Sequence, residues 1–113
     1  MFDPIAIDRP APGIAVIHVP ENFDVYAAPA VRQASVNLVQ DGVYSQVFDL
    51  SAVKFIDSTC MGVLVGAKKR LAAHDGTIVL DSPSANVRHI LNVVTGVGKV
   101  FHIVEDVYSA TEA

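Results

Sequence analysis

Four consecutive side chains that could do chemistry lie in the segment "KFIDSTCMG" (54–62), namely Asp57, Ser58, Thr59 and Cys60. A strand-like run precedes them and a helix-like run follows, so they are predicted to open a helix. A serine at this point can cap the helix by accepting a backbone N–H, or it can serve as a nucleophile. It can also accept a phosphate, because free N–H groups and the helix dipole favour an anion there. The local residues leave these three roles of Ser58 open.

Catalytic and metal-binding interpretations find little support in the residue types. The segment lacks the glycine that precedes the serine in a nucleophile elbow. Cys60 has no histidine placed locally as a base, which favours a small buried apolar residue over a catalytic thiol. The histidines are scattered, without the spacing of a local metal site; they are His18, His74, His89 and His102. We therefore expect no enzyme activity, no metal and no cofactor.

One phosphotransfer alternative stays open at Asp49. In "VFDLS" this residue ends a predicted strand, as the phospho-accepting aspartate of a receiver domain does, and the chain length also fits. Receiver domains resemble one another in an acidic pair after the first strand and a lysine near the end of the last one. Neither feature occurs in this chain, because "IAVIHV" runs into "PENFD" and Lys99 precedes its strand. Asp49 is therefore a weak competing acceptor.

Hydrophobic periodicity and breaker residues divide the chain into alternating strands and helices. "PAPG" is the predicted turn of a first hairpin, Pro29 suits the first turn of a helix, and Gly42 suits its stop. Gly62 and Gly66 fall inside a helix, where their spacing permits close packing against the sheet or a partner helix. The predicted strands cover 5–9, 14–19, 46–50, 77–82 and 99–104, and the predicted helices cover 27–38, 58–74, 83–94 and 105–113.

The resulting order, β-β-α-β-α-β-α-β-α, predicts an α/β fold with one domain over residues 1–113. Strands that alternate with helices pair in parallel through right-handed crossovers, and the leading hairpin adds an antiparallel piece. The sheet is therefore predicted to be mixed and mainly parallel. In such sheets functional groups favour the loops at the carboxyl ends of strands, and "FIDST" follows one of them.

Composition narrows the class of partner. An apolar fraction of 51% with 18% charged residues predicts a globular domain. The formal net charge of −4 argues against nucleic acid or anionic lipid as the main partner. A single cysteine cannot form an internal disulfide, the N-terminus does not resemble a signal peptide, and no run approaches the roughly 18 apolar residues of a membrane span. We expect a cytoplasmic protein without membrane contact.

The segment "VFDLSAVKFIDSTCMGVLVGAKKRLAAHDGTIVL" resembles the STAS domain of bacterial anti-sigma factor antagonists. The hallmark of that family is a D-S-small-small-[Leu or Met]-G motif that opens a helix after a strand ending in D-L-S. The resemblance continues through "ENFDVYAAPAVR" upstream and "TGVGKVFHI" downstream, so it spans nearly the whole chain. The sequence departs from the commonest pattern at Cys60 and Met61, where glycine and leucine are frequent.

The resemblance implies a phosphorylation switch in a sigma factor pathway. In this family the unphosphorylated domain binds an anti-sigma factor that is itself a serine kinase, which frees the sigma factor. Phosphorylation of the motif serine ends the binding, and a serine phosphatase resets the switch. The implied acceptor here is Ser58, with Thr59 as a less favoured one. Asp24 matches an acidic position expected near the serine, and the motif contributes further partner contacts at Asp57, Thr59, Cys60, Met61 and Gly62.

The expected partner surface is the start of the 58–70 helix together with the "ENFDVY" loop. Phe23, Val25 and Tyr26 are its predicted apolar contacts. The alternative within the same family is a STAS module outside any sigma pathway, which acts as a scaffold or as a small-ligand sensor.

Overall fold

A computed structural model describes residues 5–95 and 101–105 of the chain. Within these residues the elements follow the predicted order, with strands and helices alternating after an initial hairpin. They are β1 (Ala6–Ala11), β2 (Ile14–His18), α1 (Ala28–Gln40), β3 (Ser45–Asp49), α2 (Ser58–Ala72), β4 (Thr77–Asp81), α3 (Ala85–Thr95) and β5 (His102–Val104).

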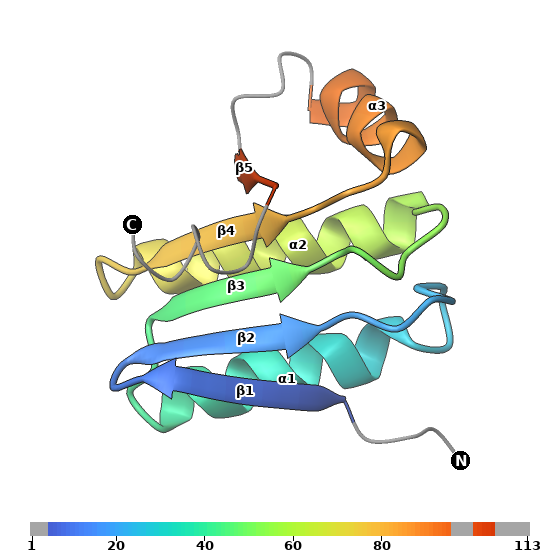
Figure 1. Cartoon of the computed structure of the whole chain (residues 1–113). Coiled ribbons are helices and arrows are strands. Elements are labelled where there is room, and N and C mark those ends of the chain that lie inside the picture. The colour runs from blue at the N-terminus through green and yellow to red at the C-terminus, as the bar shows by residue number, and fades with distance from the viewer. Residues whose placement is uncertain (1–4, 96–100, 106–113) are drawn as a thin grey trace.

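The strands form one mixed sheet in the order β1-β2-β3-β4-β5 (Figure 1). β1 pairs with β2 in the antiparallel direction, and the three remaining pairs are parallel. This confirms the predicted α/β class and the mainly parallel sheet. The carboxyl ends of β2, β3 and β4 point to the same edge, so the loops that leave them gather on one side of the molecule.

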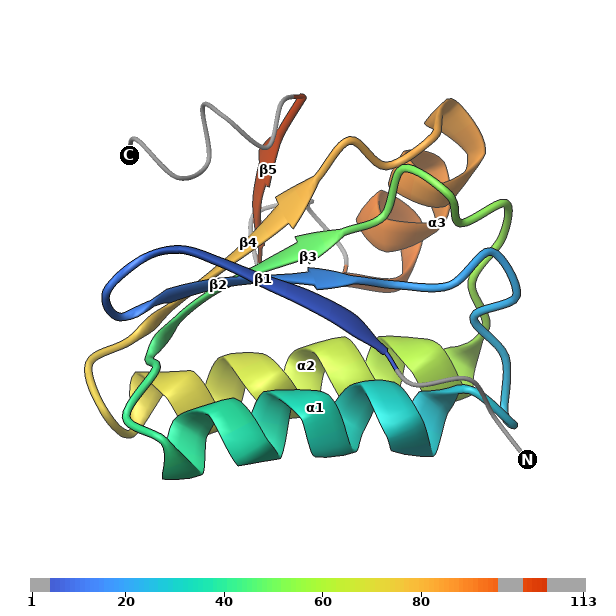
Figure 2. The same cartoon turned by 60° about the horizontal axis from the view of Figure 1, so that its bottom comes forward.

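Helices α1 and α2 lie side by side against one face of the sheet (Figure 2). The strand residues that point toward them alternate with residues that point to the opposite face. The main core forms on the helical side, and α3 adds to it through Val87 and Leu91. Its largest fully buried side chains include Ile17, Phe23, Leu38, Phe48, Leu50, Leu64, Leu71 and Leu80.

Two glycines end elements as the sequence predicts. Gly13 turns the first hairpin with φ +79°, and Gly42 follows α1 with φ +80°, a region that glycine adopts without steric cost. At the start of β5 the structure differs from the prediction, because the strand begins at His102 instead of residue 99. The predicted terminal helix over 105–113 lies outside the described residues, apart from Glu105.

Candidate functional site

Two loops meet at the edge where the parallel strands end. The first runs from Val19 to Ala27 and leads into α1, and the second runs from Leu50 to Asp57 and leads into α2. An ion pair between Lys54 Nζ and Glu21 Oε1, at 2.8 Å, joins them. Asn86 Nδ2 of α3 also donates to the Lys54 carbonyl oxygen at 3.3 Å. The loops are thus tied to each other and to α3 by polar contacts at the surface.

The second loop ends at Asp57, which caps α2. Its backbone is extended, and its Oδ1 accepts a hydrogen bond from the Cys60 N–H at 2.9 Å. The hydrogen bond from the Cys60 backbone N–H holds the pKa of Asp57 below its usual range. The residue that caps α2 is therefore Asp57 and not Ser58. Ser58 becomes the first helical residue, and its side chain is exposed.

This cap changes one expectation about a phosphate on Ser58. The sequence suggested that free N–H groups at the helix start would hold such a phosphate. The Cys60 N–H already donates to Asp57, so it is not free. A phosphate on Ser58 would have to compete with the Asp57 carboxylate for that donor.

Two motif residues predicted to touch the partner are buried instead. Cys60 is fully buried, and Met61 is nearly so. The Cys60 thiol donates to the carbonyl oxygen of Phe23 at 2.9 Å, which links α2 to the first loop. Burial, followed by the nearby Asp57 carboxylate, raises the pKa of the Cys60 thiol to about 12. Cys60 is therefore a neutral packing residue, as its type predicts, and its side chain lies beneath the surface.

Asp24 organises the first loop. Its Oδ1 accepts hydrogen bonds from the backbone N–H groups of Tyr26 and Ala27, both at 3.0 Å. Its own carbonyl oxygen accepts from the N–H of Ala28 at 2.9 Å, at the first residue of α1. Ala27 itself supplies no side-chain cap, so Asp24 fixes both the turn and the entry into α1.

The apolar residues that are exposed at this edge differ from those that the sequence predicted. Val25 and Tyr26 are exposed, at 53% and 68%, as expected of contact residues. Phe23 was also predicted as a contact, but it is fully buried and belongs to the core. Phe55 of the second loop, at 53% exposure, was not predicted. Its only signal in the sequence is an aromatic residue in a loop at the carboxyl edge of the sheet.

We call the exposed part of this edge the loop-end surface. It consists of apolar side chains beside the exposed start of α2, with the half-buried Asp24 at its margin. Its members are Val25, Tyr26, Phe55, Asp57, Ser58, Thr59 and Gly62.

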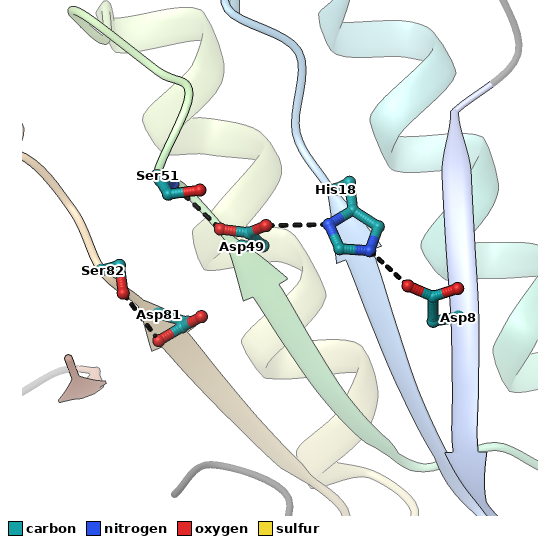
Figure 3. Close-up of polar contacts among 6 residues, drawn as sticks. All are labelled: Asp8, His18, Asp49, Ser51, Asp81 and Ser82. Carbon is teal, nitrogen blue, oxygen red and sulfur yellow. Dashed lines mark hydrogen bonds and ion pairs between the residues drawn. The ribbon is translucent and has the colours of Figure 1, made fainter. Parts of the chain in front are cut away.

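The competing acceptor Asp49 is already engaged on the face of the sheet away from α1 and α2. Its Oδ2 lies 2.8 Å from His18 Nδ1, and its Oδ1 accepts from the Ser51 N–H at 3.0 Å (Figure 3). Burial alone would raise the pKa of Asp49, but these hydrogen bonds, from Ser51 and then His18, lower it. Asp49 thus acts as an acceptor for two neighbouring groups.

Within 5–95 and 101–105, histidine, cysteine and carboxylate side chains form no group of three or more arranged to hold a metal ion. Among the helices described, none combines the length and the apolar character that a membrane span requires.

Comparison with known proteins identifies a family model and curated relatives. The STAS domain model matches residues 8–110. The chain is similar to the anti-sigma-B factor antagonist of Listeria monocytogenes, with 34% identity over 88 residues, covering 77% of this chain and 75% of the relative.

Solved structures give the same picture of the fold. An anti-sigma factor antagonist from Mycobacterium paratuberculosis is 26% identical, with a TM-score of 0.77 over 99% of this chain and 97% of that one. SpoIIAA in its unphosphorylated form is 21% identical, with a TM-score of 0.80 over 96% and 94% of the two chains. The phosphorylated form of SpoIIAA from Bacillus, at 19% identity, has a TM-score of 0.76 over 96% and 97%.

Proposed function

Because the chain belongs to the STAS-domain family of anti-sigma factor antagonists, we propose that it is a binding module switched by phosphorylation at Ser58. In its unmodified form it binds an anti-sigma factor that is a serine kinase, and thereby frees a sigma factor. The kinase phosphorylates Ser58, which ends the binding, and a serine phosphatase restores it. The protein works in the cytoplasm and catalyses no reaction itself.

The observation that carries this proposal is the position of Ser58. Its hydroxyl is exposed at the first position of α2, while the neighbouring Asp57 performs the capping that would otherwise explain a serine there. The exposed apolar side chains Tyr26 and Phe55 lie in the loops at the same edge. SpoIIAA, which shares this fold, is known in unphosphorylated and phosphorylated forms.

The charge of the loop-end surface favours a basic partner patch. Asp57 lies on this surface, and Asp24 lies at its margin. Complementary charges steer association and fix the orientation of the complex, whereas like charges oppose it. We expect the kinase to present arginine or lysine side chains opposite Asp57 and Asp24, and a close-fitting uncharged surface opposite Ser58. A phosphate there would have to be desolvated in a space that fits a hydroxyl.

Release of sigma factor tests the function directly. The unmodified protein is added to a purified complex of the sigma factor with the anti-sigma kinase, in the presence of a non-hydrolysable ATP analogue. We expect free sigma factor to appear in proportion to the protein added, and Ser58→Glu to release far less. If the unmodified protein neither binds any anti-sigma kinase of its organism nor releases sigma factor, the proposal fails.

Tyr26→Ala and Phe55→Ala are each expected to weaken kinase binding at least about tenfold, because buried aromatic anchors dominate interface energies. Both side chains are exposed in the free protein, so the free energy of unfolding should change by less than about 0.5 kcal/mol. Calorimetric titration and chemical denaturation measure the two effects. Ile7→Ala is the control, since Ile7 is partly exposed on β1, outside the loop-end surface, and its loss should leave binding unchanged.

Gly62→Ala is expected to separate stability from binding. A Cβ at this position meets no atom within 4 Å, so alanine should raise the free energy of unfolding by about 0.5–1 kcal/mol through better helix propensity. Gly62 lies one helical turn after Ser58 on the same face, where a docked partner would meet the added methyl group. We expect weaker kinase binding from a more stable protein. Unchanged binding would remove Gly62 from the contact surface.

A further inference from the structure

A row of polar side chains crosses the sheet on the face opposite to α1 and α2. His18, Asp49 and Asp81 stand at matching positions at the ends of β2, β3 and β4 (Figure 3). They share the orientation of Val16, Val47 and Val79, which form an apolar cluster separate from the main core. Asp8 of β1 completes the row, diagonally across from His18.

Both ring nitrogens of His18 contact carboxylates. Nε2 lies 2.7 Å from Asp8 Oδ2, and Nδ1 lies 2.8 Å from Asp49 Oδ2. A neutral imidazole has one donor and one acceptor, whereas an ionised carboxylate only accepts. Hydrogen bonds to two ionised carboxylates therefore need a proton on each ring nitrogen. The geometry by itself corresponds to the imidazolium form.

We propose that His18 is a proton-controlled bridge that holds the edge strand β1 to the sheet by linking Asp8 of β1 to Asp49 of β3. Every residue of β1 is exposed, so this strand has little burial of its own to hold it. Loss of the proton removes one of the two hydrogen bonds and turns a nitrogen lone pair toward a carboxylate. The same Asp49 carboxylate binds the Ser51 N–H, so the bridge also reaches the start of the second loop.

The sign of the pH dependence follows from the neighbours of His18. Hydrogen bonds from the ring to Asp8 and then Asp49 raise its pKa above 6.5, against a smaller opposing effect of burial. A group whose pKa is higher in the folded state stabilises that state fully below its unfolded pKa and loses the effect as pH rises through the folded pKa. The groups that face His18 are Asp8 and Asp49, and Asp81 is the next in the row. The bridge is thus complete below the ordinary histidine pKa and weakens as the pH rises through the raised pKa of His18.

Two measurements test the bridge together. NMR titration gives the pKa of His18, and hydrogen exchange gives protection factors for β1 amides relative to β3 amides at about pH 5.5 and pH 8.5, either side of an ordinary histidine pKa. Relative protection of β1 should fall at the higher pH. The fall should approach about tenfold for each pKa unit by which His18 exceeds its ordinary value.

Matched variants separate this bridge from general fraying of β1. Asp8→Asn changes an exposed side chain and should bring the pKa of His18 down and flatten the pH dependence of β1 protection. Asp41→Asn removes a different contact of β1, the 3.1 Å ion pair between Arg9 and Asp41. This variant should lower the protection of β1 amides equally at both pH values. A His18 pKa at or below 6.5, or a pH response identical in Asp8→Asn and the unmodified chain, would overturn the proposal.

Discussion

Phosphorylation of Ser58 is expected to weaken binding of the anti-sigma kinase by roughly two orders of magnitude, or about 3 kcal/mol. The phosphate brings about 1.5–2 negative charges at neutral pH. The Asp57 carboxylate precedes it in sequence, and that carboxylate already occupies the Cys60 N–H. The phosphate therefore competes with Asp57 for that amide, and the added charge must be desolvated beside a like charge when the partner docks.

Titration calorimetry with phosphorylated and unmodified protein measures this difference. Ser58→Ala should bind within a few-fold of the unmodified chain, because the exposed hydroxyl contributes less than the charge that replaces it. Thr59→Ala is the matched control for the adjacent exposed hydroxyl, and it should still lose affinity when Ser58 is phosphorylated. Equal affinities of the phosphorylated and unmodified proteins would contradict the charge argument. Higher salt should narrow the gap, since part of the repulsion is screened.

Gly76→Ala is expected to reduce the free energy of unfolding by about 3 kcal/mol or more, with a fall of about 12 °C in Tm. A Cβ at this position would lie 2.2 Å from the Tyr44 carbonyl oxygen and 3.0 Å from that of Leu71. The Tyr44 carbonyl also accepts from the Thr77 N–H, the first residue of β4. The methyl group therefore has to push apart the backbone where β3 and β4 begin.

Thermal and chemical denaturation measure the loss in Gly76→Ala. Gly62→Ala is the matched control, because the same substitution there enters open space and should stabilise the protein. If Gly76→Ala unfolds at the same temperature as the unmodified chain, the close approach to Tyr44 is wrong. If Gly76→Ala is less stable but still binds the kinase, the substitution affects the stability of the fold and not the binding surface.

The order and class of the elements could be predicted because each element carries its own local signal. Periodic apolar residues marked α1 and α2, while Gly13 and Gly42 marked turns whose positive φ angles the structure contains. Boundaries were less accurate, as β5 shows, because pairing with β4 decides where a short edge strand begins. The sequence allows Ser58 to cap α2, and only the geometry shows that Asp57 does so.

The site could be predicted only in part, because burial depends on contacts between distant residues. Phe23 and Val25 are neighbours of similar type, yet the first is core and the second is exposed. What separates them is the packing of the first loop against α2, including the bond from the Cys60 thiol to the Phe23 carbonyl. The sequence shows His18 only as one of four scattered histidines, because its carboxylate partners come from β1 and β3.

The central claim is that Ser58 is the acceptor of a regulatory phosphate. Intact-mass measurement and peptide mapping test it on protein purified from its own cells and on protein incubated with the ATP-dependent anti-sigma kinases of that organism. We predict one phosphate on Ser58, absent from Ser58→Ala and stable to acid and hydroxylamine, unlike an acyl phosphate on Asp49. No phosphate under any growth condition, together with no kinase binding by the unmodified protein, would contradict the switch.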